Sequence, residues 1–183
     1  MQKLDQIYEG KAKKVYATDD PKIVIVDYKD DATAFNGLKK GTIAGKGVVN
    51  NKVSNHFFRL LESRGIPTHY VEQLSDRETA VRRVEILPVE VIVRNRAAGS
   101  FSKRMGVAEG TTLACPILEY SYKNDELGDP FINSYYIRAL NFASDEEMEQ
   151  VKNYSFQIND ILKSYLDGFG IELIDFKLVF GRF

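Results

Sequence analysis

The chain has 183 residues, of which 44% are hydrophobic and 28% charged, and its formal net charge is -1. This composition is typical of a globular protein and gives no general attraction to nucleic acid or to a membrane surface. No apolar run approaches the ~20 residues of a membrane span, and the first residues lack the apolar core of a signal peptide.

The cysteine and histidine counts restrict the chemistry further. A single cysteine cannot form an internal disulfide, which fits a cytoplasmic location. With only two histidines beside it, a Cys/His zinc site is essentially excluded. Any metal would therefore be held by carboxylates, and such a site favours Mg²⁺.

The first 28 residues predict three short strands, at residues 7–9, 14–17 and 23–28. Their connections are too short for parallel crossovers, so we expect an antiparallel meander. The first turn reads GKAK, residues 10–13, and its glycine allows close approach of a ligand. Its two lysines would share a face if the turn stays extended, so nucleotide phosphates could lie beneath it. A solvated basic hairpin tip is the alternative.

Residues 29–46 are polar and rich in glycine, which predicts a long loop ordered by Phe35, Ile43 and an Asn36-Gly37 turn. A helix is expected over residues 47–64, with Gly65 closing it. The residues expected on its buried apolar face are Val49, Val53, Phe57, Leu60 and Leu61.

A second strand pair is expected at residues 68–74 and 79–86, followed by a joint at Leu87-Pro88. Such an arrangement would suit an adenine slot between two lobes, with amide contacts from the backbone of residues 82–86. Arg82 and Arg83 could equally be outward-pointing strand residues.

Residues 88–104 (PVEVIVRNRAAGSFSKR) begin as a buried strand, at 89–95, and end in a turn of small and basic residues. Gly99 can adopt a conformation closed to other residues, and Ser100 is expected to cap a short helix. Cations beside exposed amides suggest an anion site, and an ordinary basic turn is the alternative. An RNA-binding surface built on these cations is disfavoured, because aromatic residues are not interleaved with them.

The last third of the chain predicts an acidic loop, a long helix and a final strand. The loop at 123–130 carries three carboxylates that could bind Mg²⁺ or contact a substrate amine, although a solvated acidic turn is the alternative. Ser144 and Glu147 form a capping box that begins the longest helix. In the strand at 171–180, Asp175 and Lys177 share one face, which suggests a catalytic cleft or a salt bridge at a sheet edge.

Taken in order, seven segments resemble the SAICAR synthetase family (phosphoribosylaminoimidazole-succinocarboxamide synthase of purine biosynthesis). They are YEGKAKKVY (8–16), DATAFNG (31–37), GKGVVNN (45–51), GIPTH (65–69), PVEVIVRNRAAGSFSKR (88–104), KNDELGDP (123–130) and IDFKLVFG (174–181). Each is weak alone, but the ordered set is specific.

The resemblance implies an ATP-dependent ligase that joins L-aspartate to carboxyaminoimidazole ribonucleotide through an acyl phosphate, and it implies ATP and Mg²⁺ as cofactors. It also implies an α+β fold of two lobes with an ATP cleft between them. Residues 1–87 would form a kinase-like lobe with an antiparallel sheet and one helix, and residues 88–183 a mixed α/β lobe. Family members are usually homodimers or higher homo-oligomers.

The resemblance also assigns roles to individual residues. The residues expected to cover ATP phosphates or line the adenine slot are Gly10, Lys11, Ala12, Lys13, Val15, Val24, Arg82, Val84, Ile86 and Lys177. Arg94, Gly99 and Ser100 are expected to hold the ribonucleotide. The expected catalytic residues are Lys123, Asp129, Asp175 and Lys177, with Asp129 and Asp175 also as metal ligands.

Two departures from the family pattern are visible. The family strand normally reads DFKLEFG, whereas Val179 stands here at the acidic position, which is expected to weaken a Mg²⁺ site. The chain also ends at Phe183, where family members continue through a further acidic segment and an SPD…R-WD motif. A nucleotide-binding fragment without catalysis is therefore the alternative to an active ligase.

Overall fold

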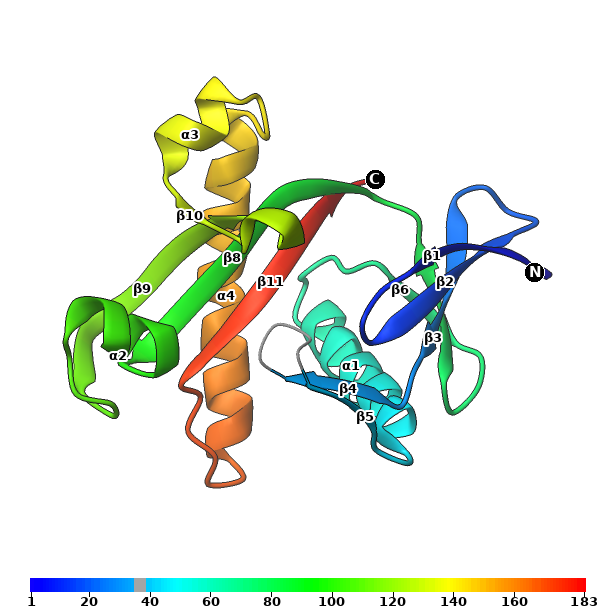
Figure 1. Cartoon of the computed structure of the whole chain (residues 1–183), viewed down its shortest axis with the longest axis horizontal. Helices are drawn as coiled ribbons and strands as arrows, with labels where there is room; N and C mark the ends of the chain where they lie inside the picture. The colour runs from blue at the N-terminus through cyan, green and yellow to red at the C-terminus, as the bar shows by residue number, and fades with distance from the viewer. Residues whose placement is uncertain (35–38) are drawn as a thin grey trace. The chain divides into compact units, whose positions relative to one another are not determined.

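The computed structural model describes residues 1–34 and 39–183 and divides into two compact units. The N-terminal unit comprises Met1–Val84 with Phe183, and the C-terminal unit comprises Glu85–Arg182. Figure 1 labels the elements of both. The division falls three residues before the expected Leu87-Pro88 joint, because residues 85–87 already belong to a strand of the C-terminal unit.

The N-terminal unit is built on a five-stranded sheet in the order β1-β2-β3-β7-β6, and every neighbouring pair is antiparallel. The predicted meander is therefore confirmed. The strands are β1 (Lys3–Glu9), β2 (Lys13–Thr18), β3 (Ile23–Tyr28), β6 (Tyr70–Gln73) and β7 (Glu78–Arg82). β3 has the predicted bounds, whereas β7 ends at Arg82 rather than at residue 86.

The segment between β3 and the first helix is not the long loop we expected. It contains a hairpin of β4 (Asp31–Ala34) and β5 (Lys39–Thr42), paired in antiparallel register. Phe35 and the Asn36-Gly37 turn lie outside the described residues. The helix α1 (Lys46–Ser63) follows, close to its predicted bounds.

The predicted apolar face of α1 is correct at Leu61, which is buried, and at the half-buried Phe57 and Leu60, but it is wrong at its first two residues. Val49 and Val53 are 59% and 48% exposed, while Asn51 and Asn55 are buried against the sheet. Thr79 of β7 donates a hydrogen bond to Asn51 Oδ1 at 2.6 Å and accepts one from Asn55 Nδ2 at 2.7 Å. These hydrogen bonds satisfy the asparagine side chains inside the protein, which makes their burial possible.

The C-terminal unit has a four-stranded antiparallel sheet in the order β10-β9-β8-β11. Its strands are β8 (Glu85–Arg96), β9 (Thr112–Tyr122), β10 (Phe131–Ile132) and β11 (Asp175–Arg182). β11 begins at Asp175 instead of at residue 171. The helices are α2 (Gly99–Met105), the 3₁₀ turn η1 (Asp125–Leu127), α3 (Ser134–Ala139) and α4 (Asp145–Asp167). As predicted, Ser144 and Glu147 form a capping box at the start of α4.

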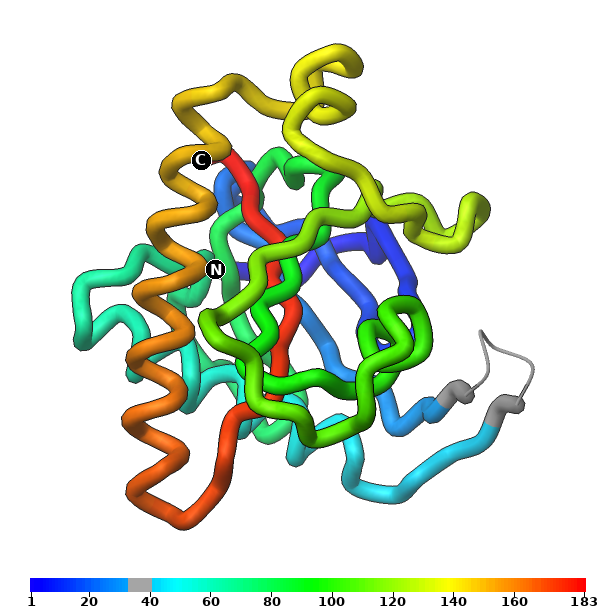
Figure 2. Tube along the Cα trace, turned by 90° about the vertical axis from the view of Figure 1, so that its left-hand side faces the viewer, coloured from blue at the N-terminus to red at the C-terminus, as the bar shows by residue number. Residues whose placement is uncertain are grey.

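Alternation along the strands divides this sheet into two chemically different faces. On one face Val89 and Val91 pack with Ile137 of α3 and Met148 and Val151 of α4. Figures 1 and 2 show α4 running along this side of the sheet. We call the opposite face the open face. It carries charged residues of three strands: Glu90 and Arg94 of β8, Glu119 of β9, and Asp175 and Lys177 of β11.

Pro88 lies inside β8, a central strand, although proline cannot donate a ladder hydrogen bond. The pairing with β11 explains how it is tolerated. Val179 pairs with Glu90 and Gly181 with Ile86, so two residues of β11 span four of β8. Pro88 therefore sits in a bulge, where its missing N–H interrupts no regular pairing.

Among the described helices, none is both long and apolar enough to cross a membrane.

Candidate functional site

The open face brings together Arg94, Asp175 and Lys177, three residues that the sequence singled out. Asp175 pairs directly with Arg94 across β11 and β8, and Lys177 lies two residues further along the same face. The Asp175 and Lys177 side chains are 37% and 59% exposed. Their charges are therefore not buried, and both form ion pairs on the edge strand β11, which was the alternative considered from the sequence.

The Arg94 guanidinium lies at the centre of this arrangement. Its side chain is only 8% exposed. Its Nε donates to Glu119 Oε2 at 2.7 Å, its Nη1 to Asp175 Oδ2 at 2.6 Å, and its Nη2 to Ser100 Oγ at 3.3 Å. Two carboxylates thus neutralise a nearly buried cation, an arrangement that fixes the orientation of its planar fork.

Lys177 contacts a carboxylate of the neighbouring strand. Its Nζ donates to Glu90 Oε2 at 2.6 Å, and the Glu90 side chain is 14% exposed. Val179, the residue at the usually acidic position, pairs across the strands with Glu90 and is 46% exposed. The open face therefore carries a carboxylate beside Val179, on β8 instead of on β11.

The turn before α2 differs from its prediction in one detail. Ala98, and not Ser100, is the N-cap of α2, and it makes no side-chain capping bond. Ser100 lies within the helix, where its hydroxyl accepts the Arg94 hydrogen bond. Gly99 has φ +54°, a left-handed conformation that favours glycine, and its N–H donates to Glu109 Oε1 at 3.1 Å.

The acidic loop is organised by its own hydrogen bonds. Asn124 caps η1 by accepting from the N–H groups of Glu126 and Leu127. Asp129, at φ +50°, accepts a hydrogen bond from the Asn124 N–H at 3.0 Å, and Lys123 is exposed. No group of three or more metal-ligating side chains gathers anywhere in residues 1–34 or 39–183.

In the N-terminal unit, Lys29 anchors the Gly10–Lys13 turn. Its backbone N–H donates to Ala12 O at 2.8 Å, and its Nζ contacts Glu9 Oε1 at 2.7 Å and Asp31 Oδ2 at 2.6 Å. Gly10 N–H donates to Lys13 O at 2.9 Å, which closes the turn. Lys11 and Lys13 are both exposed.

The residues expected around adenine divide between the two units. Val15 and Val24 pack together with Val26 and Val81 on one face of the N-terminal sheet. Arg82 is committed to structural contacts, because its Nη1 donates to Thr68 O at 2.7 Å and lies 3.9 Å from Glu62 Oε1. Val84 ends the continuous part of the N-terminal unit. Ile86 belongs to β8 of the C-terminal unit and is 53% exposed.

The pKa of His69, which lies just before β6 of this sheet, is shifted by its surroundings. Burial, together with the positive charges of Lys13 and Arg82, lowers the pKa of His69 to about 4. His69 is therefore neutral at pH 7 and packs edge-on against Phe58 of α1, with ring centroids 4.7 Å apart.

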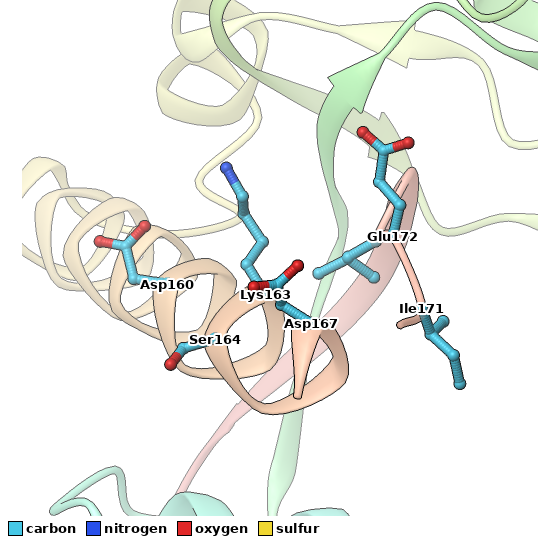
Figure 3. A pocket seen from close by; sticks show the side chains of 7 residues that line it. Asp160, Lys163, Ser164, Asp167, Ile171 and Glu172 are labelled. Carbon is cyan, nitrogen blue, oxygen red and sulfur yellow. The ribbon is translucent and has the colours of Figure 1, made fainter. Parts of the chain in front are cut away.

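A cavity of about 480 Å³ lies elsewhere, at the end of α4, and Figure 3 shows its lining side chains. Those side chains come from the last turns of α4 and from the segment that precedes β11. None of the residues that the sequence predicted for a site lines it. The lining residues are Asp160, Lys163, Ser164, Asp167, Ile171, Glu172 and Leu173.

Glu119 and Glu90, which contact Arg94 and Lys177, were not predicted as site residues from the sequence. The available signal was alternation within each strand, since Glu90 lies four residues from Arg94 on the same face of β8. The pairing of Glu119 with Ile92 depends on the register of β9, which a single strand pattern does not supply.

Comparisons with known proteins identify the family of this chain. The sequence pattern of SAICAR synthetase matches residues 6–183. The phosphoribosylaminoimidazole-succinocarboxamide synthase of Lachnoclostridium phytofermentans is 60% identical over all of this chain, which covers 78% of that protein. The corresponding protein of Coprothermobacter proteolyticus is 59% identical, with 77% of its length covered.

Solved structures give the same result. The crystal structure of the Ehrlichia chaffeensis phosphoribosylaminoimidazole-succinocarboxamide synthase superposes with a TM-score of 0.96 at 44% identity, covering 98% of this chain and 76% of that one. A SAICAR synthetase in complex with ADP superposes with a TM-score of 0.92 at 46% identity, covering 96% and 75%. This chain belongs to the SAICAR synthetase family.

Proposed function

We propose that this chain is an ATP-dependent carbon–nitrogen ligase of purine biosynthesis. It would join L-aspartate to carboxyaminoimidazole ribonucleotide and release ADP and phosphate. The observation that carries the proposal is the match over the entire chain to phosphoribosylaminoimidazole-succinocarboxamide synthases. The ADP complex of a relative that is 46% identical supports the use of ATP.

The reaction would proceed in two steps. A carboxylate oxygen of the ribonucleotide attacks the γ-phosphorus of ATP, and the bond to the ADP oxygen breaks. The aspartate amine then attacks the acyl carbon, loses a proton, and expels phosphate as the carbon–oxygen bond breaks. Phosphate is a far better leaving group than a carboxylate oxygen, so the first step makes the second possible.

In the N-terminal unit, the Gly10–Lys13 turn would cover the ATP phosphates. Exposed Lys11 and Lys13 supply positive charge, and Gly10 and Ala12 let the backbone approach closely. Lys29 supports this role because its N–H donates to Ala12 O in the turn and its Nζ contacts Glu9 just before the turn. The adenine contacts are assigned to Val15 and Val24 and to the chain at Arg82, Val84 and Ile86, where Arg82 would contribute its backbone because its side chain already contacts Thr68 and Glu62.

In the C-terminal unit, Arg94 and Ser100 would hold the ribonucleotide, with Gly99 shaping the turn behind them. Lys177 would contact ATP phosphates, and Lys123 and Asp129 would face the reacting groups. The shared open face of Arg94, Asp175 and Lys177 supports this grouping.

Carboxylates are the donors that Mg²⁺ prefers, and Asp175 presents one on the open face at 37% exposure. We assign Asp175 and Asp129 as the residues that would hold Mg²⁺. Bound there, the ion would neutralise charge on phosphate oxygens.

We further propose a cytoplasmic, homo-oligomeric enzyme that acts on small molecules and binds neither nucleic acid nor membrane. Its nucleotide-covering lobe would be residues 1–87 and its substrate lobe residues 88–183.

A nucleotide-binding protein without catalysis is the second candidate. It is favoured by Val179, an apolar residue 46% exposed among the charged groups of the open face. ADP release distinguishes the two candidates. The protein is mixed with Mg²⁺-ATP and the carboxylated ribonucleotide, with and without L-aspartate. Aspartate-dependent ADP release supports the ligase, whereas ATP binding by calorimetry without release supports the second candidate.

The assignment of the turn has its own test. We expect Lys11→Ala to weaken ATP binding and to leave ribonucleotide binding unchanged, because Lys11 lies in the turn of the N-terminal sheet. Lys22→Ala is the matched control, since Lys22 is an exposed lysine in another turn of that sheet. Equal ATP affinities of the two variants in calorimetry would contradict the assignment.

A further inference from the structure

Glu119 is a residue of β9 for which the sequence predicted no role. Glu119 pairs with Ile92 across β9 and β8, which places it on the open face with Arg94. Its side chain is only 13% exposed. A carboxylate this buried is stable only with cationic or hydrogen-bonding partners around it.

Glu119 has two such partners, one for each oxygen. Oε2 accepts from Arg94 Nε at 2.7 Å, and Oε1 forms an ion pair with Arg104 Nη2. The Arg104 guanidinium also lies over the Phe131 ring, 3.9 Å from its centroid. One carboxylate therefore connects β8, β9 and α2, and Arg104 extends the connection to β10.

The two acidic partners of Arg94 are not equivalent. Glu119 is 13% exposed and is shared with a second arginine, whereas Asp175 is 37% exposed and lies on the edge strand β11. The Nε side of the guanidinium is thus held by the more buried partner. The Nη side faces Asp175 and Ser100, the partners that an incoming anion can replace at lower cost.

We propose that Glu119 is a positioning residue for the reaction. It holds the Arg94 guanidinium by its Nε edge, so that the Nη edge is oriented toward the phosphate or carboxylate of the ribonucleotide. The inference rests on the proposed function only in identifying that ligand. Without Glu119, Arg94 keeps Asp175 as its acidic partner and is drawn toward β11, away from the productive orientation.

The test compares two variants that break the same Glu119–Arg104 ion pair from opposite sides. In Glu119→Gln, Arg94 loses the carboxylate that holds its Nε edge, and we expect the KM for the ribonucleotide to rise on the order of 10-fold or more. The KM for ATP is expected to change less than about 2-fold, because the substitution does not alter the residues assigned to ATP. In Arg104→Gln, Glu119 still holds Arg94, and the expected rise in the ribonucleotide KM is below about 3-fold.

A purely structural role for Glu119 predicts a different result. Both variants would then loosen α2 equally and would change the two KM values together. That outcome would overturn the proposal. Glu149→Gln, which removes an exposed carboxylate from α4, controls for the change in net charge. If Glu119→Gln does not fold, Glu119→Asp keeps the charge but shortens the side chain, and it must also raise the ribonucleotide KM.

Direct binding separates this inference from the proposed function. Calorimetric titration with the carboxylated ribonucleotide, in the absence of ATP and aspartate, requires no turnover. If the wild-type protein binds the ribonucleotide but releases no ADP, the proposed function fails and the Glu119 inference is still decided by the affinity ratio. If the Glu119→Gln and Arg104→Gln affinities are equal, the inference fails even when the wild-type protein is fully active.

Discussion

The buried contact between α1 and β7 predicts a specific loss of stability. Thr79 is 2% exposed, and its hydroxyl hydrogen bonds to both Asn51 and Asn55, which are 0% and 1% exposed. Thr79→Val keeps the shape of the side chain and removes both hydrogen bonds. Asn55 Nδ2 then loses its acceptor at 2.7 Å and keeps the longer hydrogen bond to Asn51 Oδ1, at 3.3 Å. The asparagine pair is left partly unsatisfied while both side chains stay buried.

The magnitude follows from these contacts. Two hydrogen bonds of about 1 kcal/mol each, with up to about 2 kcal/mol for an unpaired buried amide, give a loss of about 2–4 kcal/mol. For a chain of this size, that lowers Tm by about 5–15 °C. Thermal and urea unfolding followed by circular dichroism would measure it. Val53→Thr, which makes the opposite exchange on the exposed side of α1, is expected to change stability by less than about 0.5 kcal/mol.

The reasoning would be refuted if Thr79→Val were as stable as the wild-type protein, or if Val53→Thr cost as much. Either result would mean that α1 packs through its valines, as its apolar spacing suggests.

Two further predictions concern stability. Gly47→Ala is expected to lower the free energy of unfolding by about 1–3 kcal/mol, because a Cβ there would lie 2.3 Å from Tyr28 O. Gly41→Ala is the control, since a Cβ at Gly41 would have no atom within 4 Å, and urea unfolding should show a smaller loss for it. The Arg182 guanidinium and the Ser144 N–H lower the pKa of Glu147 from 4.5 to about 2, so the stabilisation is complete above about pH 4.5 and is lost as pH falls toward 2. Accordingly, the Tm difference between the wild-type protein and Glu147→Gln should shrink over that range, and a constant difference would contradict the assignment.

Local signals in the sequence predicted the elements that depend on neighbouring residues. The Ser144 capping box and the β3 strand were correct because cap chemistry and β-branched alternation act within a few residues. The fold class and the family also follow from the ordered segments. These features require no knowledge of distant partners.

The errors have a common physical cause in contacts between distant parts of the chain. On α1, both Val49-Val53 and Asn51-Asn55 are spaced four residues apart, and apolar residues are normally buried in preference to amides. Thr79, 24 residues after Asn55, reverses that preference. Likewise, Glu119 meets Arg94 through strand register, and Ser100 serves Arg94 instead of a helix end.

The two faces of the C-terminal sheet are expected to accumulate substitutions at different rates within the family. Along β11, Phe176, Leu178 and Phe180 alternate with Asp175 and Lys177. The apolar residues can change together with those of α4, because packing depends on the combined volume of the side chains. The charged residues are constrained by their ion-pair partners on β8. We therefore expect substitution rates along β11 to alternate between successive positions, higher at the apolar residues and lower at the charged ones.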